Sequence, residues 1–534
     1  MKETEKKGTA KAYFSKGVQV LFLVLGNTAL IAGIWRGVHF DGVTAATMIY
    51  QLTVPMDGAD PGNFTSLFWA LGIGIPVLTA LELLLVRPIR EWLDRMEVRR
   101  AAKGAARKNP EDVREDEPEK QVTPKKFKWR FFRNHPVAAA ATWFGLVALF
   151  MLMRMQVFSY CIRVMFPSSL YEDYYVAAED VSLKAPEERR NLIYIYLESM
   201  EITYADRTDG GVASENRIPY LTELAYAGEN FSDDGKLNGM LPVEGALWTC
   251  GSLVSQSCGT PLIVPIGRNN MGKGYTEFLP GAYSIGEILA ADGYNQIFMQ
   301  GSEIRFAGTD TFLTCHGGAE VRDYEYYRKG NRLPSEDYFV WWGFEDALLY
   351  AFAREEITKA AQEDKPFAVT IMTIDTHFTD GYRCDLCGDD FAVQYDNVIR
   401  CADNQIRDFV QWIQSQDFYE NTTVVIVGDH PTMDSHYYKE LSGKDKKYQR
   451  KAYAVILNSV VEYEFGKARS YSAFDMFPTT LAALGYEIPG NRLGLGVNLY
   501  SDEPTLVEEM GLKKLNKELV KHSKYYNRHI VADE

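Results

Sequence analysis

The sequence predicts an α/β domain built on a mainly parallel sheet covered by helices, with a membrane region of three helices before it. From Asn191 onward, apolar runs of strand length alternate with helix-like segments, an order typical of βαβ units. Three of these runs end in charged or metal-binding side chains: at Glu198, at residues 375–377, and at Asp429 and His430. Three longer apolar runs near the amino terminus predict the membrane region.

The three long apolar runs cover residues 18–35, 64–86 and 137–160. A helix that spans a bilayer needs roughly 20 apolar residues, so each run has about the required length. The first run is not expected to be a cleaved leader, because no small-residue cleavage site follows it and two further runs do. Buried core helices are the alternative, but such helices rarely lack a polar face over this length.

The distribution of basic residues predicts how the chain is oriented in the membrane. The loop over residues 87–136 is rich in Arg and Lys, whereas the segment between the first two runs holds Arg36 and almost no other base. Basic loops stay in the cytoplasm, so the amino terminus and this loop are expected there. Three spans then place everything after about residue 161 outside. We therefore expect a multi-pass cell-membrane protein whose catalytic domain is extracytoplasmic.

Four parts follow from this layout. A membrane domain covers residues 1–164, and a polar connector covers 165–187. The α/β catalytic domain is expected over 188–505, and an amphipathic tail of mixed charge over 506–534. The tail is expected either to pack on the domain or to lie near the lipid headgroups, and the sequence does not choose between the two.

The expected elements of the catalytic domain can be given in chain order. The strand-like stretches, with the polar residues that end some of them, are 191–199, 296–300, 367–377, 423–430 and 452–457. The helix-like segments are 218–229, 283–293, 341–362 and 399–414. In open α/β sheets, ligands bind outside the carboxyl ends of the strands, so the polar strand ends are expected to form one site.

Length, charge and cysteine content limit the possible classes. The chain of 534 residues is too long for one ordinary core. Its net charge of −15 argues against a nucleic-acid binder that works by neutralising phosphates. The seven cysteines are Cys161, Cys250, Cys258, Cys315, Cys384, Cys387 and Cys401.

Glu198, Asp429 and His430 form a candidate metal site. Two carboxylates and one imidazole suit Mn²⁺ or Mg²⁺ better than a metal that prefers thiolates. Zn²⁺ also accepts His and carboxylate ligands. A capped turn would explain a lone Asp-His pair. It does not explain why three strands of one chain end in such residues.

Thr249 is the candidate nucleophile. It precedes a short stretch that can begin a helix. There its hydroxyl could attack phosphorus while free backbone N–H groups hold the phosphoryl oxygens. A metal ion beside the hydroxyl would make it easier to deprotonate. A simple helix N-cap is the alternative role for Thr249, and spacing alone leaves both open.

Several motifs together resemble a known family. They are Leu197-Glu198-Ser199, Trp248-Thr249 with the later Ser-Gln-Ser-Cys-Gly-Thr-Pro-Leu, Asp375-Thr376-His377, and Gly428-Asp429-His430-Pro431, with further likeness at residues 301–308 and 475–480. The set resembles the phosphoglycerol transferases, membrane enzymes related to lipoteichoic acid synthase in the alkaline phosphatase and sulfatase superfamily. The branch that decorates periplasmic glucans looks most similar. The resemblance covers roughly residues 188–500 and the membrane topology.

The resemblance implies an alkaline-phosphatase/sulfatase-like fold and a role for each motif residue. Glu198, Thr249, Asp429 and His430 would bind one divalent ion, with Mn²⁺ favoured and Mg²⁺ or Zn²⁺ as alternatives. Thr249 would also be the nucleophile that forms a phosphoglycerol-threonine intermediate. His377 would contact the substrate phosphate or help to transfer protons. Arg305 would hold glycerol or phosphate, with a surface or structural role as the equal alternative, and His436 is a weaker candidate.

The resemblance also implies the substrates. The donor would be phosphatidylglycerol in the outer leaflet, and the acceptor a glycan or glycolipid; no nucleic acid is expected as a partner. Two departures from the family are visible: three spans where four or five are common, and fewer ligands than its two-metal relatives have. The second departure favours one metal ion.

Three alternatives to this function remain at this point. A phosphoethanolamine transferase would use the same nucleophile with another donor, and a phosphodiesterase would use water as the acceptor. A non-catalytic membrane-anchored binding or sensor protein would have lost ligands or the nucleophile, yet all are present. A sulfatase needs a Cys-x-Pro-Ser-Arg signature, and Gly251-Ser252-Leu253-Val254 follows Cys250 instead.

The expected outside location bears on the cysteines. All except Cys161, which lies at the membrane edge, could form disulfides in an oxidising compartment. Cys384 and Cys387 form a CxxC pair for which a zinc knuckle is the rival interpretation. The pairing cannot be derived from the sequence.

Overall fold

The computed structural model describes residues 2–39, 61–105, 135–154, 165–263 and 277–532, apart from residues 234, 444, 446, 464 and 465. The chain forms two compact units. The first unit comprises residues 1–43 and 60–159, and the second comprises residues 44–59 and 160–534. The predicted limits of the connector and the catalytic domain stay predictions, and Cys161 and most of the basic loop lie outside the described residues.

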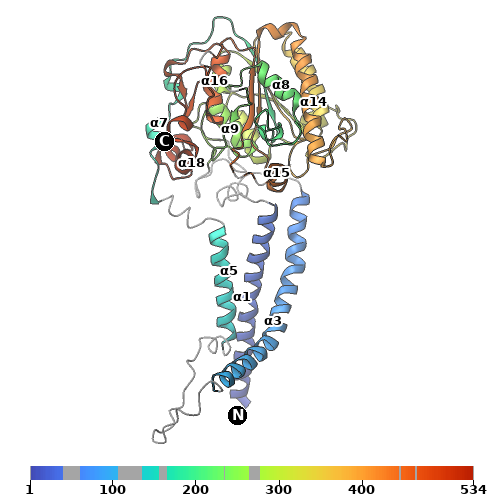
Figure 1. The fold of residues 1–534 in the computed structure, drawn as a ribbon, viewed down its shortest axis with the longest axis vertical. Coiled ribbons are helices and arrows are strands. Elements are labelled where there is room, and N and C mark those ends of the chain that lie inside the picture. The colour runs from blue at the N-terminus through green and yellow to red at the C-terminus, as the bar shows by residue number, and fades with distance from the viewer. Residues whose placement is uncertain are drawn as a thin grey trace. The chain divides into compact units, whose positions relative to one another are not determined.

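The first unit contains the long helices α1 (Lys2–His39), α3 (Pro61–Ala105) and α5 (Pro136–Arg154) (Figure 1). Each has an apolar segment that is long enough to cross a membrane, as judged by length and composition. Only 22%, 6% and 11% of the residues in these segments are buried, so they are not core helices of this unit. This supports a membrane protein. Residues 155–160 of the third predicted span lie outside the described residues.

Polar and small side chains join the helices of this unit. The Asn27 side chain of α1 donates to the Thr79 hydroxyl (3.1 Å) and to the Glu82 carboxylate (3.0 Å), both on α3. Gly26 of α1 lies directly against Trp143 of α5, where a Cβ would come within 3.3 Å of the indole ring. Hydrogen bonds between side chains and close approach at small residues are the contacts that hold apolar helices together in lipid.

The second unit is built on a seven-stranded sheet in the order β2-β7-β6-β1-β5-β3-β4. The strands are β1 (Asn191–Leu197), β2 (Gly239–Met240), β3 (Asn295–Gln300), β4 (Glu320–Arg322), β5 (Phe367–Met372), β6 (Thr422–Gly428) and β7 (Ala452–Leu457). The five strands from β6 to β4 are parallel, whereas β7 is antiparallel to β6 and β2 is antiparallel to β7. The predicted mainly parallel α/β sheet is confirmed.

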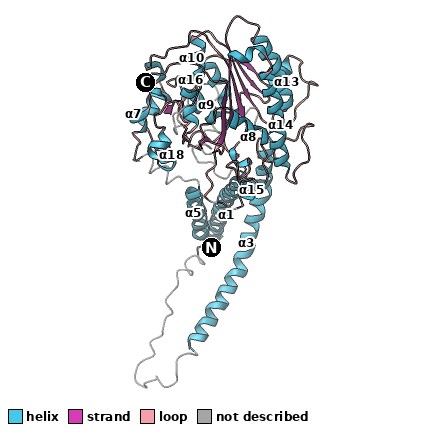
Figure 2. Cartoon of the chain, turned by 45° about the horizontal axis from the view of Figure 1, so that its top comes forward, coloured by secondary structure: helices cyan, strands magenta, loops and turns pink. Residues whose placement is uncertain are grey.

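The central strand β1 is buried on both faces because its side chains alternate between two hydrophobic cores. Tyr194 and Tyr196 face the core formed with α9 (Thr249–Cys258), α10 (Ile285–Ala291) and α16 (Met476–Ala483). Ile193 and Ile195 face the core formed with α8 (Pro219–Ala227), α13 (Asp346–Ala360) and α14 (Gln394–Gln414). Figure 2 shows the strands between these two groups of helices.

Two helices begin five residues from their predicted starts, one later and one earlier. The segment 341–362 becomes helical only at Asp346: Trp341 has a left-handed backbone (φ 67°), and the N-cap residue Glu345 is still extended (ψ 161°). Helix α14 begins at Gln394, five residues before the predicted start. The polar residue Asp396 is buried in its first turn, where Arg217 (3.2 Å) and the Tyr437 hydroxyl (2.6 Å) hold its carboxylate, so apolar periodicity missed this turn.

The carboxyl-terminal tail packs on the second unit. Helices α17 (Leu506–Met510) and α18 (Leu512–Leu519) are followed by a helical turn at Tyr526–Ile530. Leu515, Leu519 and Tyr526 are buried in the core that contains α9. The Tyr526 hydroxyl donates to the Pro261 carbonyl (2.7 Å), and the Asn516 amide donates to the Pro242 carbonyl (3.1 Å). Of the two sequence alternatives, the structure has the tail on the domain.

Candidate active site

The carboxyl ends of β1 and β6 lie side by side and carry the candidate ligands. Leu197 is in register with Gly428, so Glu198 and Asp429 follow at the same edge of the sheet. The Asp429 N–H donates to the Leu197 carbonyl (3.2 Å), and the Ser199 N–H donates to Asp429 Oδ1 (2.8 Å). Ser199 has φ 52°, so the chain leaves β1 through a left-handed residue that turns its N–H toward Asp429.

Helix α9 brings Thr249 to these strand ends. Thr249 Oγ1 lies 3.3 Å from Glu198 Oε2 and 3.4 Å from His430 Nε2. His430 Nε2 in turn lies 3.3 Å from Asp429 Oδ2 and 3.8 Å from Glu198 Oε1. Four residues that the sequence predicts as site residues therefore lie together around one point.

The donor set of this cluster fits a divalent cation. One ligand atom from each of Glu198, Asp429 and His430 lies within 4.8 Å of the others, and all three residues are buried. Asp429 Oδ2 is buried and has no hydrogen-bond partner among the described residues. His430 Nδ1 is paired with the Pro431 carbonyl (3.1 Å), which leaves the Nε2 lone pair directed at the carboxylates. A buried, unpaired carboxylate oxygen beside an imidazole lone pair is a site for positive charge.

The electrostatics of the cluster agree with this. Burial and the negative charge of Glu198 raise the pKa of Asp429. Burial lowers the pKa of His430, but the charges of Asp429 and Glu198 outweigh it and the net shift is upward. Both upward pKa shifts show that positive charge between the two carboxylates is favourable, whether it comes from a proton or from a cation.

Thr249 is the first residue of α9, and Trp248 is the N-cap. The first regular helical bond runs from the Ser252 N–H to the Trp248 carbonyl (2.8 Å), so the N–H groups of Thr249 and Cys250 lie ahead of the helical ladder. The positive end of the helix dipole also lies here. The helix start therefore supplies donors for anionic oxygens next to the hydroxyl.

Polar side chains that were not predicted from the sequence hold α9 in place. The Ser252 hydroxyl donates to the Asp429 carbonyl (2.5 Å), and the Gln256 amide donates to the Ser252 hydroxyl (2.8 Å). The Tyr194 hydroxyl of β1 donates to Gln256 Oε1 (2.6 Å). Ser252 and Gln256 are four residues apart on α9, so they lie on the same face of a helix that is otherwise buried. This spacing was the available signal.

Arg450 and Glu201 also went unrecognised. Arg450 forms an ion pair with the fully buried Glu201 and donates to the Thr432 carbonyl (2.9 Å). The Thr432 N–H donates to Glu201 Oε1 (3.2 Å). This pair fixes the turn that follows Asp429 and His430. No sequence spacing indicates it, because Arg450 lies 249 residues after Glu201.

His377 lies in the loop after β5, near the cluster. Its ring packs against Trp342 and Phe378, with 4.8 Å between ring centroids in each case. Nδ1 is paired with the Phe378 carbonyl (2.7 Å), which leaves Nε2 as an acceptor. Burial lowers the pKa of His377 to about 4. The charge of His430 acts in the same direction, whereas that of Asp429 opposes it. The adjacent Thr376 hydroxyl donates to the Glu198 carbonyl (2.5 Å).

The remaining two candidates are surface residues. The Arg305 side chain is 58% exposed and pairs with Glu303 at 2.6 Å. The His436 side chain is 84% exposed and lies 3.7 Å from Glu440. Each is engaged with a neighbouring carboxylate on its own segment, and the role of Arg305 stays a prediction.

A family model for sulfatases matches residues 190–486. Because this is more than half of the chain, the chain belongs to the sulfatase family. It is similar to phosphoglycerol transferase I of Xanthomonas axonopodis pv. citri (strain 306), with 26% identity over 518 residues, 92% of this chain and 62% of that protein. Phosphoglycerol transferase I of Salmonella choleraesuis (strain SC-B67) is 29% identical over 337 residues, 62% of this chain and 42% of that protein.

Among solved structures, the lipoteichoic acid synthase LtaP from Listeria monocytogenes aligns with 62% of this chain and 81% of its own, at 16% identity and a TM-score of 0.47. The predicted resemblance to the phosphoglycerol transferases is confirmed by the curated relatives. The chain spans less than two thirds of the length of these relatives.

Proposed function

We propose that this protein is a membrane-anchored, metal-dependent phosphoglycerol transferase. It would move glycerol phosphate from phosphatidylglycerol, through a covalent intermediate on Thr249, to a glycan or glycolipid acceptor. The observation that carries the proposal is the position of Thr249 Oγ1, 3.3 Å from Glu198 and 3.4 Å from His430 at the start of α9. The relatives named phosphoglycerol transferase I support the choice of donor.

Glu198, Asp429 and His430, together with the Thr249 hydroxyl, would hold one divalent ion. Mn²⁺ is favoured and Mg²⁺ or Zn²⁺ are alternatives, because the donor set is two carboxylates and one imidazole. When bound, the ion supplies positive charge that favours deprotonation of a hydroxyl and stabilises negative charge on phosphoryl oxygens.

The residues of the chain divide the reaction into two displacements at phosphorus. In the first, Thr249 Oγ1 gives up its proton and bonds to phosphorus while the bond from phosphorus to the diacylglycerol oxygen breaks. That oxygen takes up a proton, so neutral diacylglycerol leaves. In the second, an acceptor hydroxyl loses its proton and bonds to phosphorus, and Thr249 leaves and regains a proton. The N–H groups at the start of α9 would hold the phosphoryl oxygens throughout.

His377 would assist at the leaving or attacking oxygen. Its free Nε2 can accept a proton or a hydrogen bond, because Nδ1 is committed to the Phe378 carbonyl. Trp342 and Phe378 both pack against the ring, so its direction is restricted before substrate arrives. The three apolar helices would keep the domain at the membrane where the lipid donor lies.

Release of diacylglycerol tests this function. The full chain is reconstituted with Mn²⁺ in vesicles of phosphatidylglycerol or of phosphatidylethanolamine, without acceptor, and compared with Thr249→Val. The proposal predicts about one diacylglycerol released per enzyme from phosphatidylglycerol, and none by the variant. Release from phosphatidylethanolamine alone would indicate the other donor, and continued release without acceptor would indicate a phosphodiesterase. No release by a folded enzyme would indicate a binding protein.

A further inference from the structure

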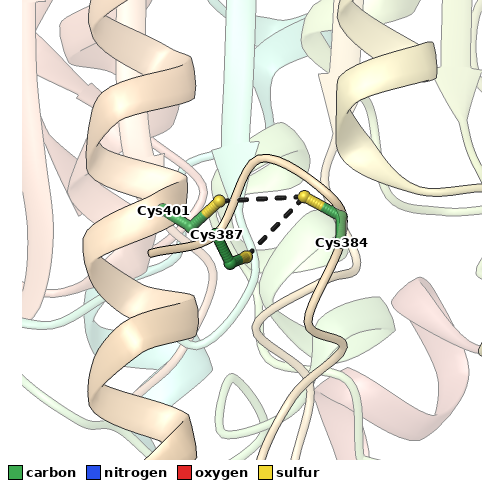
Figure 3. A group of neighbouring side chains, drawn as sticks. All are labelled: Cys384, Cys387 and Cys401. Carbon is green, nitrogen blue, oxygen red and sulfur yellow. Dashed lines mark hydrogen bonds between the residues drawn. The ribbon is translucent and has the colours of Figure 1, made fainter. Parts of the chain in front are cut away.

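Three cysteine side chains converge at a second place in the catalytic unit (Figure 3). Cys384 Sγ lies 3.7 Å from Cys387 Sγ and 3.7 Å from Cys401 Sγ. The three sulfur atoms all lie within 4.8 Å of one another. Cys384 and Cys387 are in the loop between β5 and α14, whereas Cys401 is on α14 itself. This group shares no residue with the Glu198, Asp429 and His430 cluster.

We propose that Cys384, Cys387 and Cys401 bind one zinc ion. A tetrahedral zinc ion with Zn–S bonds of about 2.3 Å holds its sulfur ligands about 3.8 Å apart, and two of the separations here are 3.7 Å. Three thiols around one point can all bind a single metal ion, whereas a disulfide would use two of them and leave the third unpaired. Cys384, Cys387 and Cys401 are all free thiols, with no disulfide among them.

The surroundings of the sulfurs support this assignment. Cys384 and Cys401 are buried. Gln405, one turn after Cys401 on α14, is only 8% exposed and directs its amide at the sulfurs. Its Nε2 lies 3.3 Å from Cys401 Sγ and 3.7 Å from Cys384 Sγ. An N–H donor aimed at sulfur stabilises the thiolate form that zinc requires.

In the other orientation of its amide, Gln405 can instead complete the coordination. Its Oε1 is buried and has no hydrogen-bond partner among the described residues. A half turn of the amide would present this oxygen, in place of the nitrogen, to an ion held by the three sulfurs. Thiolates exclude the hard ions expected at the Glu198 cluster, so the two sites would select different metals. Binding exchanges the three thiol protons for the ion, and the protons go to solvent.

The proposed zinc would fasten the loop that carries His377 to α14. The Tyr382 N–H donates to the Asp375 carbonyl (2.7 Å), and the Tyr395 hydroxyl of α14 donates to the Thr376 carbonyl (2.6 Å). The first contact lies within the loop and the second joins it to α14, so zinc at Cys384 and Cys401 would add a further link between the loop and this helix. His377 would thereby keep its direction, a consequence that rests on the proposed function, while zinc binding itself does not.

Metal content of the full-length chain tests the proposal. The protein is purified in detergent without chelator after growth with zinc, and its zinc is counted by elemental analysis and by native mass spectrometry. We expect one zinc per chain in the wild type, in Asp429→Asn and in Cys315→Ser, a cysteine outside the group. We expect it to be lost in Cys401→Ser and in Cys387→Ser, whose half-buried position makes the second variant the safer one for folding.

Three results would overturn the proposal. One is wild-type protein that holds no zinc and whose three cysteines react freely with an alkylating reagent. Another is a disulfide between any two of the three in peptides from unreduced protein. The third is zinc that persists in both cysteine variants but disappears in Asp429→Asn, since it would then belong to the Glu198 cluster. None of these readouts depends on transferase activity, so failure here is separable from failure of the proposed function.

Discussion

The hydroxyl oxygen of Thr249 lies 3.4 Å from Nε2 of His430, although 181 residues separate the two along the chain. The contact exists because β1 and β6 end in register and because Ser252 joins α9 to the Asp429 carbonyl. The reactive group and the candidate ligands are thus positioned by buried strands and a buried helix.

Thr249→Val should abolish phosphoglycerol transfer, with a loss of about 10³-fold or more, because valine keeps the shape but has no oxygen to bond to phosphorus. Thr249→Ser should retain measurable activity. Transfer of labelled glycerol phosphate from phosphatidylglycerol is the assay, with Thr314→Val on another helix as the control. Equal activity in Thr249→Val and wild type would rule out Thr249 as the nucleophile.

Asp429→Asn should separate metal binding from folding. The variant keeps an oxygen to accept the Ser199 and His430 N–H groups, and it removes the unpaired Oδ2 charge beside Glu198. We expect thermal stability without metal to be equal to or above that of the wild type, and the stabilisation by added Mn²⁺ to disappear. The check is the melting temperature with and without Mn²⁺ or EDTA. Unchanged stabilisation by Mn²⁺ would contradict the assignment.

Ser252→Ala should lower kcat for transfer and cost about 1–3 kcal/mol in the free energy of unfolding, because the buried Asp429 carbonyl and the Gln256 amide lose their partner. Ser255→Ala on the same helix is the matched control, since the buried Ser255 hydroxyl has no hydrogen-bond partner in the part of the chain that the structure describes and its removal should be nearly neutral. Denaturant unfolding and steady-state kinetics measure both. A similar loss of kcat and stability in the two variants would mean that any alanine in α9 is harmful and that the Ser252 contacts have no special role.

Arg450→Met should destabilise the protein by about 3–5 kcal/mol, because the fully buried Glu201 carboxylate would lose its counter-charge. Arg407→Met provides the comparison: Arg407 pairs with Asp408 on the surface, and its loss should change the free energy of unfolding by about 0.5 kcal/mol or less. The measurement is the free energy of unfolding of both variants, from chemical denaturation at one pH. Indistinguishable stabilities would mean that the Glu201 pair does not hold the turn after His430.

Asp403 should make stability depend on pH. Its carboxylate accepts the Tyr220 and Leu221 N–H groups at the start of α8, yet burial raises its pKa to about 6. Between the pKa of the unfolded chain, near 4, and that value, the folded state binds more protons, so the free energy of unfolding falls as pH rises. The fall should be smaller in Asp403→Asn. If the free energy of unfolding changed with pH in the same way in both proteins between pH 4 and 7, Asp403 would not be the cause of the pH dependence.

Much of the sheet could be predicted from the sequence because buried parallel strands are continuous apolar runs. The three strand ends that carry Glu198, Asp375 and Asp429 were visible for that reason. The antiparallel direction of β7 was not, since a strand buried on both faces has the same composition in either direction. The start of α14 was hidden because Asp396 is polar and buried.

Within the site, motif residues were predictable and their supports were not. Ser252, Gln256 and Arg450 act through contacts with distant segments, which spacing along the chain does not reveal. The CxxC pair drew attention to Cys384 and Cys387. Cys401 joins them only because α14 folds back over the loop, 17 residues after Cys384.

Peptide mass spectrometry of the full chain, incubated with phosphatidylglycerol and Mn²⁺ in the absence of acceptor, tests the proposed Thr249 intermediate directly. We expect a phosphoglycerol adduct on the peptide that contains Thr249, absent in Thr249→Val and absent with EDTA. An adduct on another residue, or none on folded, metal-loaded protein that still transfers glycerol phosphate, would contradict it.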